Sequence, residues 1–343
     1  MKIARRFSLL LAVAVAISAS LMPQSSASVK IKAGSKCTKL NAKVTTTSRD
    51  IFQCKRVGKY LIWKLVGKAP VPSPYLWREE FNTPVGTAPN ALNWTALIGN
   101  GWEQLGLWAF GTGELEQNSA TAAATDGAGN MVITTTKTNG VWTSARYWTQ
   151  GNINFFYGKI EARIKMPVGS FNWPAFWMLG SNYAPPNWAF GKKAWPMCGE
   201  IDIAEGLHGN EDYSSTIHAN VQGTQRPWNN GGGLSAASNL YDAPGTYHTY
   251  GIRWQPNEIT FTVDGYEIVT NTKIGRYVVQ TVSGYEFNRF DAGTIWPFNQ
   301  PFFLIINNAV SPSATNVADG ANSKMYIDWI RYSKYQGYGQ AIR

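Results

Sequence analysis

"KIEARIKM", residues 159–166, alternates charged and apolar side chains at every position. On a β-strand, successive side chains point to opposite faces, so Ile160, Ala162, Ile164 and Met166 would share one face. The charged members would share the other face. The stretch therefore predicts a strand that packs one face on a core and turns the other toward water.

Similar patterns continue along the chain after this stretch. "EITFTVDG" (258–265) alternates in the same way and ends in Asp-Gly, a pair that favours a hairpin turn. "QPFFLIINNAV" (300–310) and "KMYIDWIRYS" (324–333) are also strand-like, and no long amphipathic helical pattern appears in this part of the chain. We therefore predict an all-β domain over residues 75–343, built as one sandwich of two packed antiparallel sheets.

The first 74 residues divide into three parts. Residues 1–28 carry basic residues, then an apolar run, then small residues, which is typical of a secretory signal peptide. The apolar run is too short to predict a membrane span, so we expect a secreted protein, extracellular or associated with the cell wall. Residues 29–68 form a small module that a Cys37–Cys54 disulfide would stabilise, and residues 69–74, "APVPSP", predict a stiff linker.

The net charge of +10 is unevenly distributed. Residues 1–68 hold 14 Lys and Arg against one acid, whereas the rest of the chain holds 17 against 20 acids. The main domain is therefore slightly acidic, which argues against nucleic acid as a partner. Two roles fit the basic module: attachment to anionic cell-wall polymers, or simply a soluble basic leader.

The segment "GEIDIAEG", residues 199–206, places three acids among aliphatic residues. On a regular strand Glu200 and Asp202 share a face, whereas Glu205 would point to the other. A β-bulge at Ala204 or its neighbour would return Glu205 to the common face. Like charges crowded there raise a carboxyl pKa, as the acid of a glycoside hydrolase requires. The alternatives are a calcium site or a solvated acidic strand, but calcium prefers ligands from a loop.

Tryptophans accompany these acids. "NWPAFWMLG" (172–180) places Trp173 and Trp177 four residues apart, on one face of a strand, and Trp188 and Trp195 follow in a loop-like stretch. A single tryptophan is more often a core residue than a ligand contact. Aromatic faces beside acids nevertheless suit a cleft for sugar rings, so we predict that Trp173, Trp177 and Trp195 stack on sugars.

These segments resemble glycoside hydrolase family 16, in the bulged form typical of laminarinases, which are endo-β-1,3-glucanases. The resemblance runs from about Trp77 to Tyr332 through seven blocks in the family's order: "LWREEF", "TSARYWTQGNINFFYGKIEARIKMP", "NWPAFWMLG", "AWPMCGEIDIAEG", "STIHAN", "YHTYGIRWQPNEITFTVDG" and "YIDWIRY". It implies a β-jelly-roll and a retaining mechanism. It also implies that Glu200 is the nucleophile, Asp202 its assistant and Glu205 the acid/base.

Further residues follow from the resemblance and from their chemistry. His218, in "STIHAN", matches a family histidine near the acidic strand, and we expect it and Arg146 to bind substrate, Arg146 through sugar hydroxyls. The reaction needs no cofactor. The family often binds a structural calcium away from the cleft, here through Glu80 and Asp328; the alternative is that both are ordinary surface acids.

The choice of substrate depends on segments that depart from the family pattern. "GTGE" (111–114) replaces Gly-Asn-Asn-Glu, and "NNAVSPS" (307–313) replaces Asn-Leu-Ala-Val-Gly-Gly, both beside the family's cleft. Sulfated polymers would favour several basic cleft residues, and only Arg146 and Arg226 are candidates. We therefore expect a monomeric enzyme that cuts internal β-1,3 (or β-1,3/1,4) linkages of a neutral glucan such as laminarin.

Three different functions also fit the sequence. The enzyme acts on another polysaccharide of the family (agar, carrageenan or galactan), or it is a transglycosylase, in which a sugar replaces the attacking water. A glucan-binding protein on the same fold is the non-enzyme alternative. Relatives of that kind lose the catalytic acids, so the intact Glu200 and Glu205 argue against it.

Overall fold

The computed structural model describes residues 31–69, 71, 73–184, 195–206, 213–219, 234–236 and 245–343. The chain divides into two compact units between residues 72 and 73, inside the stretch predicted as a linker. The predicted signal peptide, residues 1–28, lies outside the described residues. In the described part of the chain, no helix has the length and apolar character needed to span a membrane.

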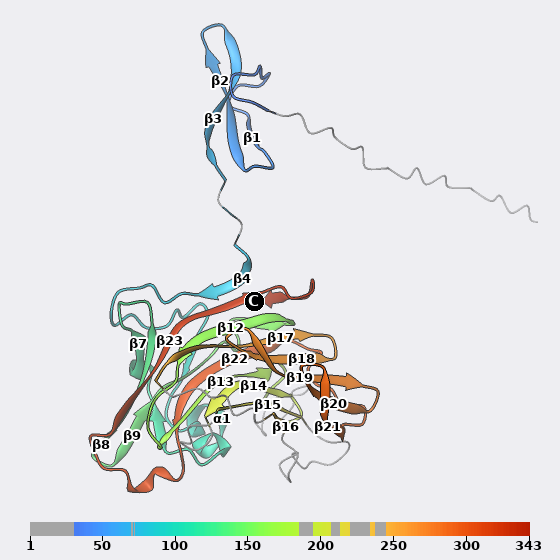
Figure 1. Ribbon diagram of the computed structural model, residues 1–343. Coiled ribbons are helices and arrows are strands. Elements are labelled where there is room, and N and C mark those ends of the chain that lie inside the picture. Colours follow the sequence, from blue (N-terminus) through green and yellow to red (C-terminus); the bar gives the residue numbers. More distant parts are fainter. Residues whose placement is uncertain are drawn as a thin grey trace, which may run out of the picture. The chain divides into compact units, whose positions relative to one another are not determined.

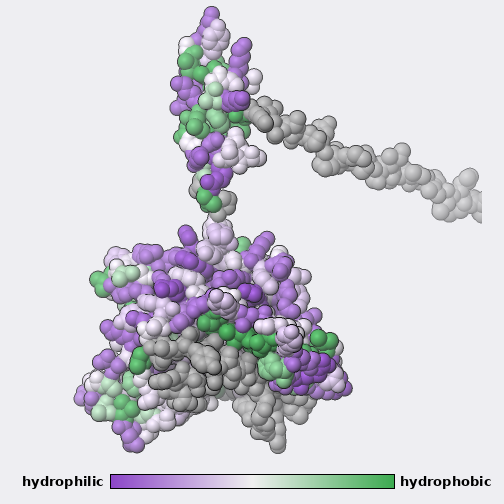
Figure 2. Space-filling view, viewed as in Figure 1, coloured by the Kyte–Doolittle hydropathy of each residue, from purple (hydrophilic) through white to green (hydrophobic). Residues whose placement is uncertain are grey.

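The first unit is one small antiparallel sheet of three strands, in the order β1 (Lys43–Thr45), β2 (Asp50–Val57) and β3 (Tyr60–Lys68). A disulfide joins Cys37 to Cys54, and Cys54 and Phe52 are buried. Leu65 and Val66 remain exposed, and Figure 2 shows apolar and hydrophilic residues side by side on this unit. Because so small a sheet buries little surface, the disulfide supplies part of its stability.

The second unit consists of two mostly antiparallel sheets packed face to face (Figure 1). The inner sheet has the order β16 (Leu234–Ala236), β15 (Tyr213–His218), β14 (Glu200–Gly206), β13 (Asn172–Gly180), β22 (Phe302–Val310), β10 (Arg146–Trp148) and β5 (Thr95–Leu97), with β11 (Asn154–Phe156) beside β22 and β24 (Gln340–Ile342) beside β11. This is the predicted all-β sandwich, in the jelly-roll arrangement.

The outer sheet covers the other face of the core. Its order is β21 (Tyr285–Asp291), β20 (Tyr277–Val282), β19 (Tyr266–Ile274), β18 (Glu258–Val263), β17 (Tyr247–Gln255), β12 (Gly158–Lys165), β23 (Asn322–Ser333), β8 (Met131–Thr138), β9 (Val141–Ser144) and β6 (Glu116–Asn118), with β4 (Tyr75–Glu79) beside β23 and β7 (Ala123–Thr125) beside β8. Short helices lie in the connections: α1 (Trp102–Leu105), η1 (Trp108–Gly111), η2 (Ala120–Ala122) and η3 (Ala314–Asn316).

The core lies between the two sheets. Along β12, buried and half-buried residues alternate as predicted, and Ile160 and Ile164 belong to the same apolar cluster as Phe176 and Met178 of β13. All nine residues of β22 are buried, because this strand runs through the middle of the inner sheet between β13 and β10. The side of the inner sheet that faces away from this core carries the functional site.

Candidate active site

The acidic segment forms β14, and this strand contains the predicted bulge. Between Asp202 and Glu205, β14 has two residues, Ile203 and Ala204, where the neighbouring strand β15 has one, Ser215. The Ser215 hydroxyl donates to the Ile203 carbonyl at 2.8 Å, which satisfies a backbone group at the bulge. All three carboxylates of the segment therefore line the same pocket, and the bulge prediction is confirmed.

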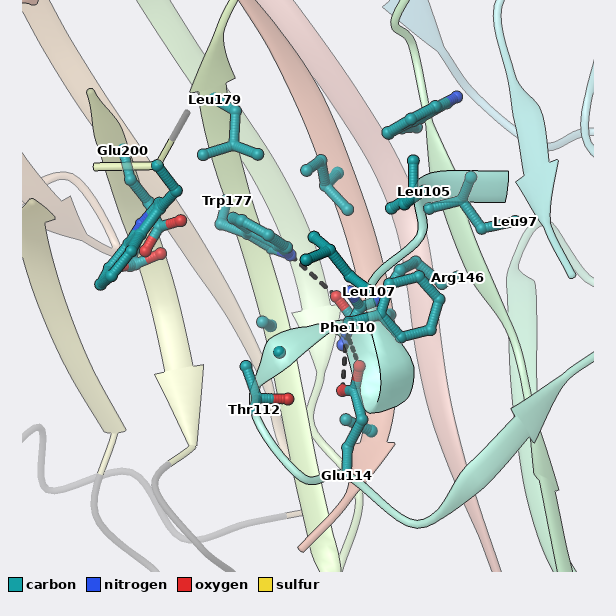
Figure 3. A pocket seen from close by; sticks show the side chains of 18 of the residues that line it. Leu97, Leu105, Leu107, Phe110, Thr112, Glu114, Arg146, Trp177, Leu179 and Glu200 are labelled. Atoms are coloured by element: carbon teal, nitrogen blue, oxygen red, sulfur yellow. Dashed lines mark hydrogen bonds and ion pairs between the residues drawn. The ribbon is translucent and has the colours of Figure 1, made fainter. Parts of the chain in front are cut away.

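The pocket runs across the inner sheet and has a volume of about 600 Å³. It extends from the carboxylates on β14 over β13, β22 and β10 to Leu97 on β5. Residues 101–112, which include α1 and η1, border the β5 end; we call them the rim segment. Leu105, Leu107 and Phe110 of the rim segment contribute to the pocket wall (Figure 3). The pocket thus has a carboxylate end at β14 and a rim end.

Three predicted tryptophans line this pocket. Trp173 and Trp177 lie on the pocket face of β13, as their spacing predicts, and Trp195 lines the carboxylate end. The Trp173 Nε1 donates to Glu205 Oε1 at 2.7 Å, whereas the Trp177 Nε1 donates to Asn307 Oδ1 at 2.8 Å. The same indoles that offer ring faces to the pocket therefore also hold polar side chains in place.

His218 contacts the carboxylates and is not among the residues that line the pocket, so its role in substrate binding stays a prediction. Its strand, β15, lies on the far side of β14 from the pocket. The His218 Nε2 lies 3.1 Å from Asp202 Oδ2 and 3.7 Å from Glu200 Oε1. Burial lowers the pKa of His218, but the hydrogen bond and the charge of Asp202 raise it by more, so that it lies at about 9. One ligand atom from each of Glu200, Asp202 and His218 lies within 4.8 Å of the others, so a metal ion there would have to displace the proton of His218.

Burial raises the pKa of both glutamates of β14. The pKa of Glu205 rises to about 7, first through burial and then through the charge of Asp202, while the bond from Trp173 lowers it. The pKa of Glu200 lies well above its ordinary value for the same two reasons, while His218 lowers it. The three acids of β14 together therefore retain one proton near neutral pH. The adjacent His218 cation lowers the pKa of both glutamates, which reduces the rise without cancelling it.

A second charged group lies at the rim end. The Arg146 Nη2 donates to both carboxylate oxygens of Glu114, at 2.7 and 2.8 Å, and the Arg146 guanidinium carbon lies 3.9 Å from the centre of the Phe110 ring. Next to this pair, Glu116 accepts a bond from the Val310 amide at 2.8 Å. In Figure 3, Trp177 lies between Glu200 and the Arg146–Glu114 pair. Arg146 thus lines the pocket with its Nη2 engaged by Glu114, and its binding of sugar hydroxyls stays a prediction.

The second unit matches known proteins over most of its length. Residues 113–331 match the model of "Glycosyl hydrolases family 16". The chain belongs to this family. It is 31% identical to a beta-glucanase of Rhodothermus marinus over 76% of this chain and 85% of that one. It is 35% identical to a keratan-sulfate endo-1,4-beta-galactosidase of Sphingobacterium multivorum, over 54% of this chain and 39% of that one.

Solved structures agree with this assignment. The laminarinase of Flavobacterium sp. UMI-01 is 29% identical, with a TM-score of 0.57, over 76% of this chain and all of that one. The protein is therefore a family 16 glycoside hydrolase, and its inner sheet carries the family's acidic motif.

In this family 16 chain, sequence reasoning did not assign roles to Glu114, Phe110 or Asn307. The sequence marks residues 111–114 and 307–313 only as departures from the family pattern, and both segments contribute to the pocket wall. An acid in a Gly-rich segment was the available signal for Glu114. Its partner Arg146 lies 32 positions away, and that pairing depends on how distant segments meet in the fold.

The two predicted calcium ligands of the family 16 chain each contact an arginine. Glu80 accepts bonds from Arg331 at 3.0 and 2.8 Å, and Asp328 accepts one from Arg163 at 2.5 Å. A calcium ion there would compete with these arginines, and the calcium site stays a prediction. Two further residues of interest lie outside the described residues: Trp188 and Arg226.

Proposed function

We propose that the protein is a secreted, monomeric endo-glycosidase that hydrolyses internal β-1,3 linkages of a neutral glucan such as laminarin, with retention of configuration. Mixed β-1,3/1,4-glucan suits the same chemistry. The observation that carries the proposal is the bulge in β14, because it brings Glu200, Asp202 and Glu205 into a pocket that is lined by tryptophans.

The reaction would proceed in two steps. The Glu200 carboxylate attacks the anomeric carbon while Glu205 gives its proton to the departing glycosidic oxygen, which leaves a covalent glycosyl-enzyme. Glu205, now ionised, takes a proton from water, and the resulting hydroxide displaces Glu200 from the sugar. Asp202, held by His218 at 3.1 Å, keeps a negative charge beside both glutamates, which supports the proton on Glu205. These side chains supply the chemistry without a cofactor.

The charge of the pocket favours a neutral polymer. Among the described residues that line it, Arg146 is the only cationic side chain, and it is already paired with Glu114. The remaining charged residues of the lining are the three acids of β14. A sulfated chain would meet net negative charge, whereas a neutral sugar can stack on the indoles and hydrogen-bond to the acids.

The test is a substrate panel. The protein is incubated with laminarin, lichenan, agarose, carrageenan and arabinogalactan, and new reducing ends are measured. We expect release from laminarin first, then from lichenan, with β-configured products at early times. Release from a galactan alone would replace the glucan proposal. Galactans belong in the panel because the relative from Sphingobacterium multivorum is named an endo-galactosidase.

Two further outcomes of the same panel would point to an activity other than hydrolysis. Longer oligosaccharides formed from an added acceptor would indicate a transglycosylase, because a sugar then replaces the attacking water. Binding to laminarin without any new reducing ends would indicate a glucan-binding protein. The intact acids of β14 favour hydrolysis over both.

For the first unit, we propose attachment to anionic cell-wall polymers. Residues 31–69 carry ten Lys and Arg against one acid, Asp50, whose nearest basic partner is Lys68 at 4.0 Å. Deleting residues 29–74 should leave hydrolysis of soluble glucan unchanged, lower binding to walls and weaken the salt dependence of what remains. Equal wall binding by both forms would reject this role.

A further inference from the structure

We propose that Trp102 and Trp108 form a second glucan-binding surface on the rim segment, which holds the part of a long chain that extends beyond the pocket. The proposal rests on the proposed function, since it takes a glucan as the substrate. It adds a binding site outside the pocket and predicts a preference for polymers over short oligosaccharides.

The two indoles are unusually exposed. Among the tryptophans in the described residues, only three are exposed: Trp102 at 58%, Trp108 at 66% and Trp195 at 37%. Trp195 already lines the pocket. A tryptophan is the largest apolar side chain, and two of them left in water on one short segment indicate a binding surface more than an accident of packing.

The rim segment that carries these indoles lies beside the pocket. Its inner side chains, Leu105 and Phe110, contribute to the pocket wall. The backbone is tightly folded: at Gly101, where φ is +88°, a Cβ would lie 2.8 Å from the Leu107 carbonyl oxygen and 2.9 Å from the Phe110 ring. Trp102 and Trp108 each begin one of its two short helices and lie outside the pocket lining. They are therefore presented at the rim without being part of the wall.

The path of the pocket leads a bound chain toward this surface. The pocket crosses the inner sheet from β14 to Leu97 on β5. The next residue along the chain, Ile98, is joined to the rim segment, because its amide donates to Gln104 Oε1 at 2.7 Å. A glucan that fills the pocket and continues past β5 thus reaches the rim segment. Since Glu103 is the only charged residue in 101–112, the surface suits a neutral polysaccharide and not the anionic partner proposed for the basic module.

The test compares two substrates for each variant. We would measure kcat/KM on polymeric laminarin and on a short β-1,3-gluco-oligosaccharide for the wild type, for Trp102→Ala/Trp108→Ala and for Tyr285→Ala. Tyr285 is a matched control, because it is a comparably exposed aromatic residue (81%) on β21 of the outer sheet. Because the substitutions remove exposed rings, the fold should be retained, and thermal unfolding of each variant checks this.

In the double variant we expect the ratio of polymer to oligosaccharide efficiency to fall about tenfold, which corresponds to roughly 1.4 kcal/mol of binding. Trp102→Phe/Trp108→Phe should recover most of the ratio, and Tyr285→Ala should leave it unchanged. An unchanged ratio in the double variant, or an equal fall in Tyr285→Ala, overturns the proposal. Failure of the proposed function is distinguishable, because a wild type that cuts neither laminarin substrate fails before any variant is compared.

Discussion

The two ends of the pocket each contain buried carboxylates, but their charges are compensated differently. At the rim end, burial raises the pKa of Glu114 to about 8 and raises that of Glu116, while the charge of Arg146 lowers both. One proton on this pair leaves one negative charge against one arginine. At the β14 end, the only cation that contacts the three acids within the described residues is His218. With one proton retained, that end remains negative.

This difference in charge suggests that the β14 end carries out the reaction, whereas the rim end stabilises the fold. The transition state of glycoside cleavage carries positive charge on the sugar, so an excess negative charge beside the scissile bond stabilises it. The rim end has no such excess, and its bidentate bonds join Arg146 on β10 to Glu114. We therefore expect substitutions at β14 to act on rate, and equivalent substitutions at the rim end to act on stability.

The largest expected effect is the loss of Glu200. We expect Glu200→Ala to lower hydrolysis of laminarin on the order of 10⁴-fold or more, because no covalent intermediate can form. Added azide should fill the vacated space and give a glycosyl azide of inverted configuration, which NMR of the product identifies. Retained activity in Glu200→Ala would remove it as the nucleophile and would end the contrast between the two ends.

The bulge is the next test of the β14 end. Deleting Ala204 leaves one residue between Asp202 and Glu205, and also disturbs the bond from Ser215 to the bulge. Both glutamates still share a face, so we expect folding to survive. The acid would move by about 1 Å, which lowers kcat about 100-fold.

A harsher change gives the control for that deletion. Inserting a second alanine after Ala204 turns Glu205 away from the pocket if the bulge is retained, and moves it further along the strand from Asp202 if the strand becomes regular; in both cases the acid leaves its position. We expect this variant to lose all measurable activity, while circular dichroism of both variants checks the fold. Full activity in the insertion variant would show that Glu205 does not act from this face.

The sequence predicts the β14 end far better than the rim end, for a physical reason. Side chains alternate with a period of two in residues 159–166, and residues 199–206 depart from that period. Both are local properties, so the strands and the bulge could be inferred from short stretches. The same local rule predicts that the three acids of β14 share a face, and that the two tryptophans of β13 do. The disulfide between Cys37 and Cys54 also joins residues that are close in sequence.

The remaining features depend on contacts between distant segments. The contact of His218 with Asp202 depends on the pairing of β15 with β14 in the sheet, which no local pattern specifies. The contact of Arg146 with Glu114, and the arginines opposite Glu80 and Asp328, also join residues that are far apart in the chain. Charged side chains therefore mark a site in the sequence, but their partners become visible only in the fold.

The third prediction compares the stability effects of one substitution at each end. Arg146→Gln leaves Glu114 and Glu116 buried without their cation, so we expect a loss of about 3 kcal/mol in unfolding free energy. Glu205→Gln should instead raise the free energy of unfolding at pH 7. The folded-state pKa of Glu205 is about 7 against an ordinary 4.5, so its ionisation in the unfolded chain opposes folding increasingly as pH rises between these values.

Urea unfolding at two pH values measures this contrast. At pH 7 we expect Glu205→Gln to gain up to about 3 kcal/mol, and the gain should vanish below about pH 4.5, where both states of the wild type hold the proton. Arg146→Gln should be less stable than the wild type at pH 7. A shift of both variants in the same direction would show that the two ends are not electrostatically different.

The smallest expected effect distinguishes two tryptophans on the same strand. The Trp173 indole donates to Glu205, whereas the Trp177 indole donates to the neutral amide of Asn307. The first bond favours the ionised form of Glu205, so Trp173→Phe should raise its pKa. Because Glu205 must be protonated to act, the alkaline limb of kcat/KM should move to higher pH, by less than about one unit. Trp177→Phe removes a similar ring surface and should raise KM as well, but its alkaline limb should coincide with that of the wild type. Identical limbs in both variants would mean that Trp173 does not tune the acid, and that its contribution to the pocket is its ring alone.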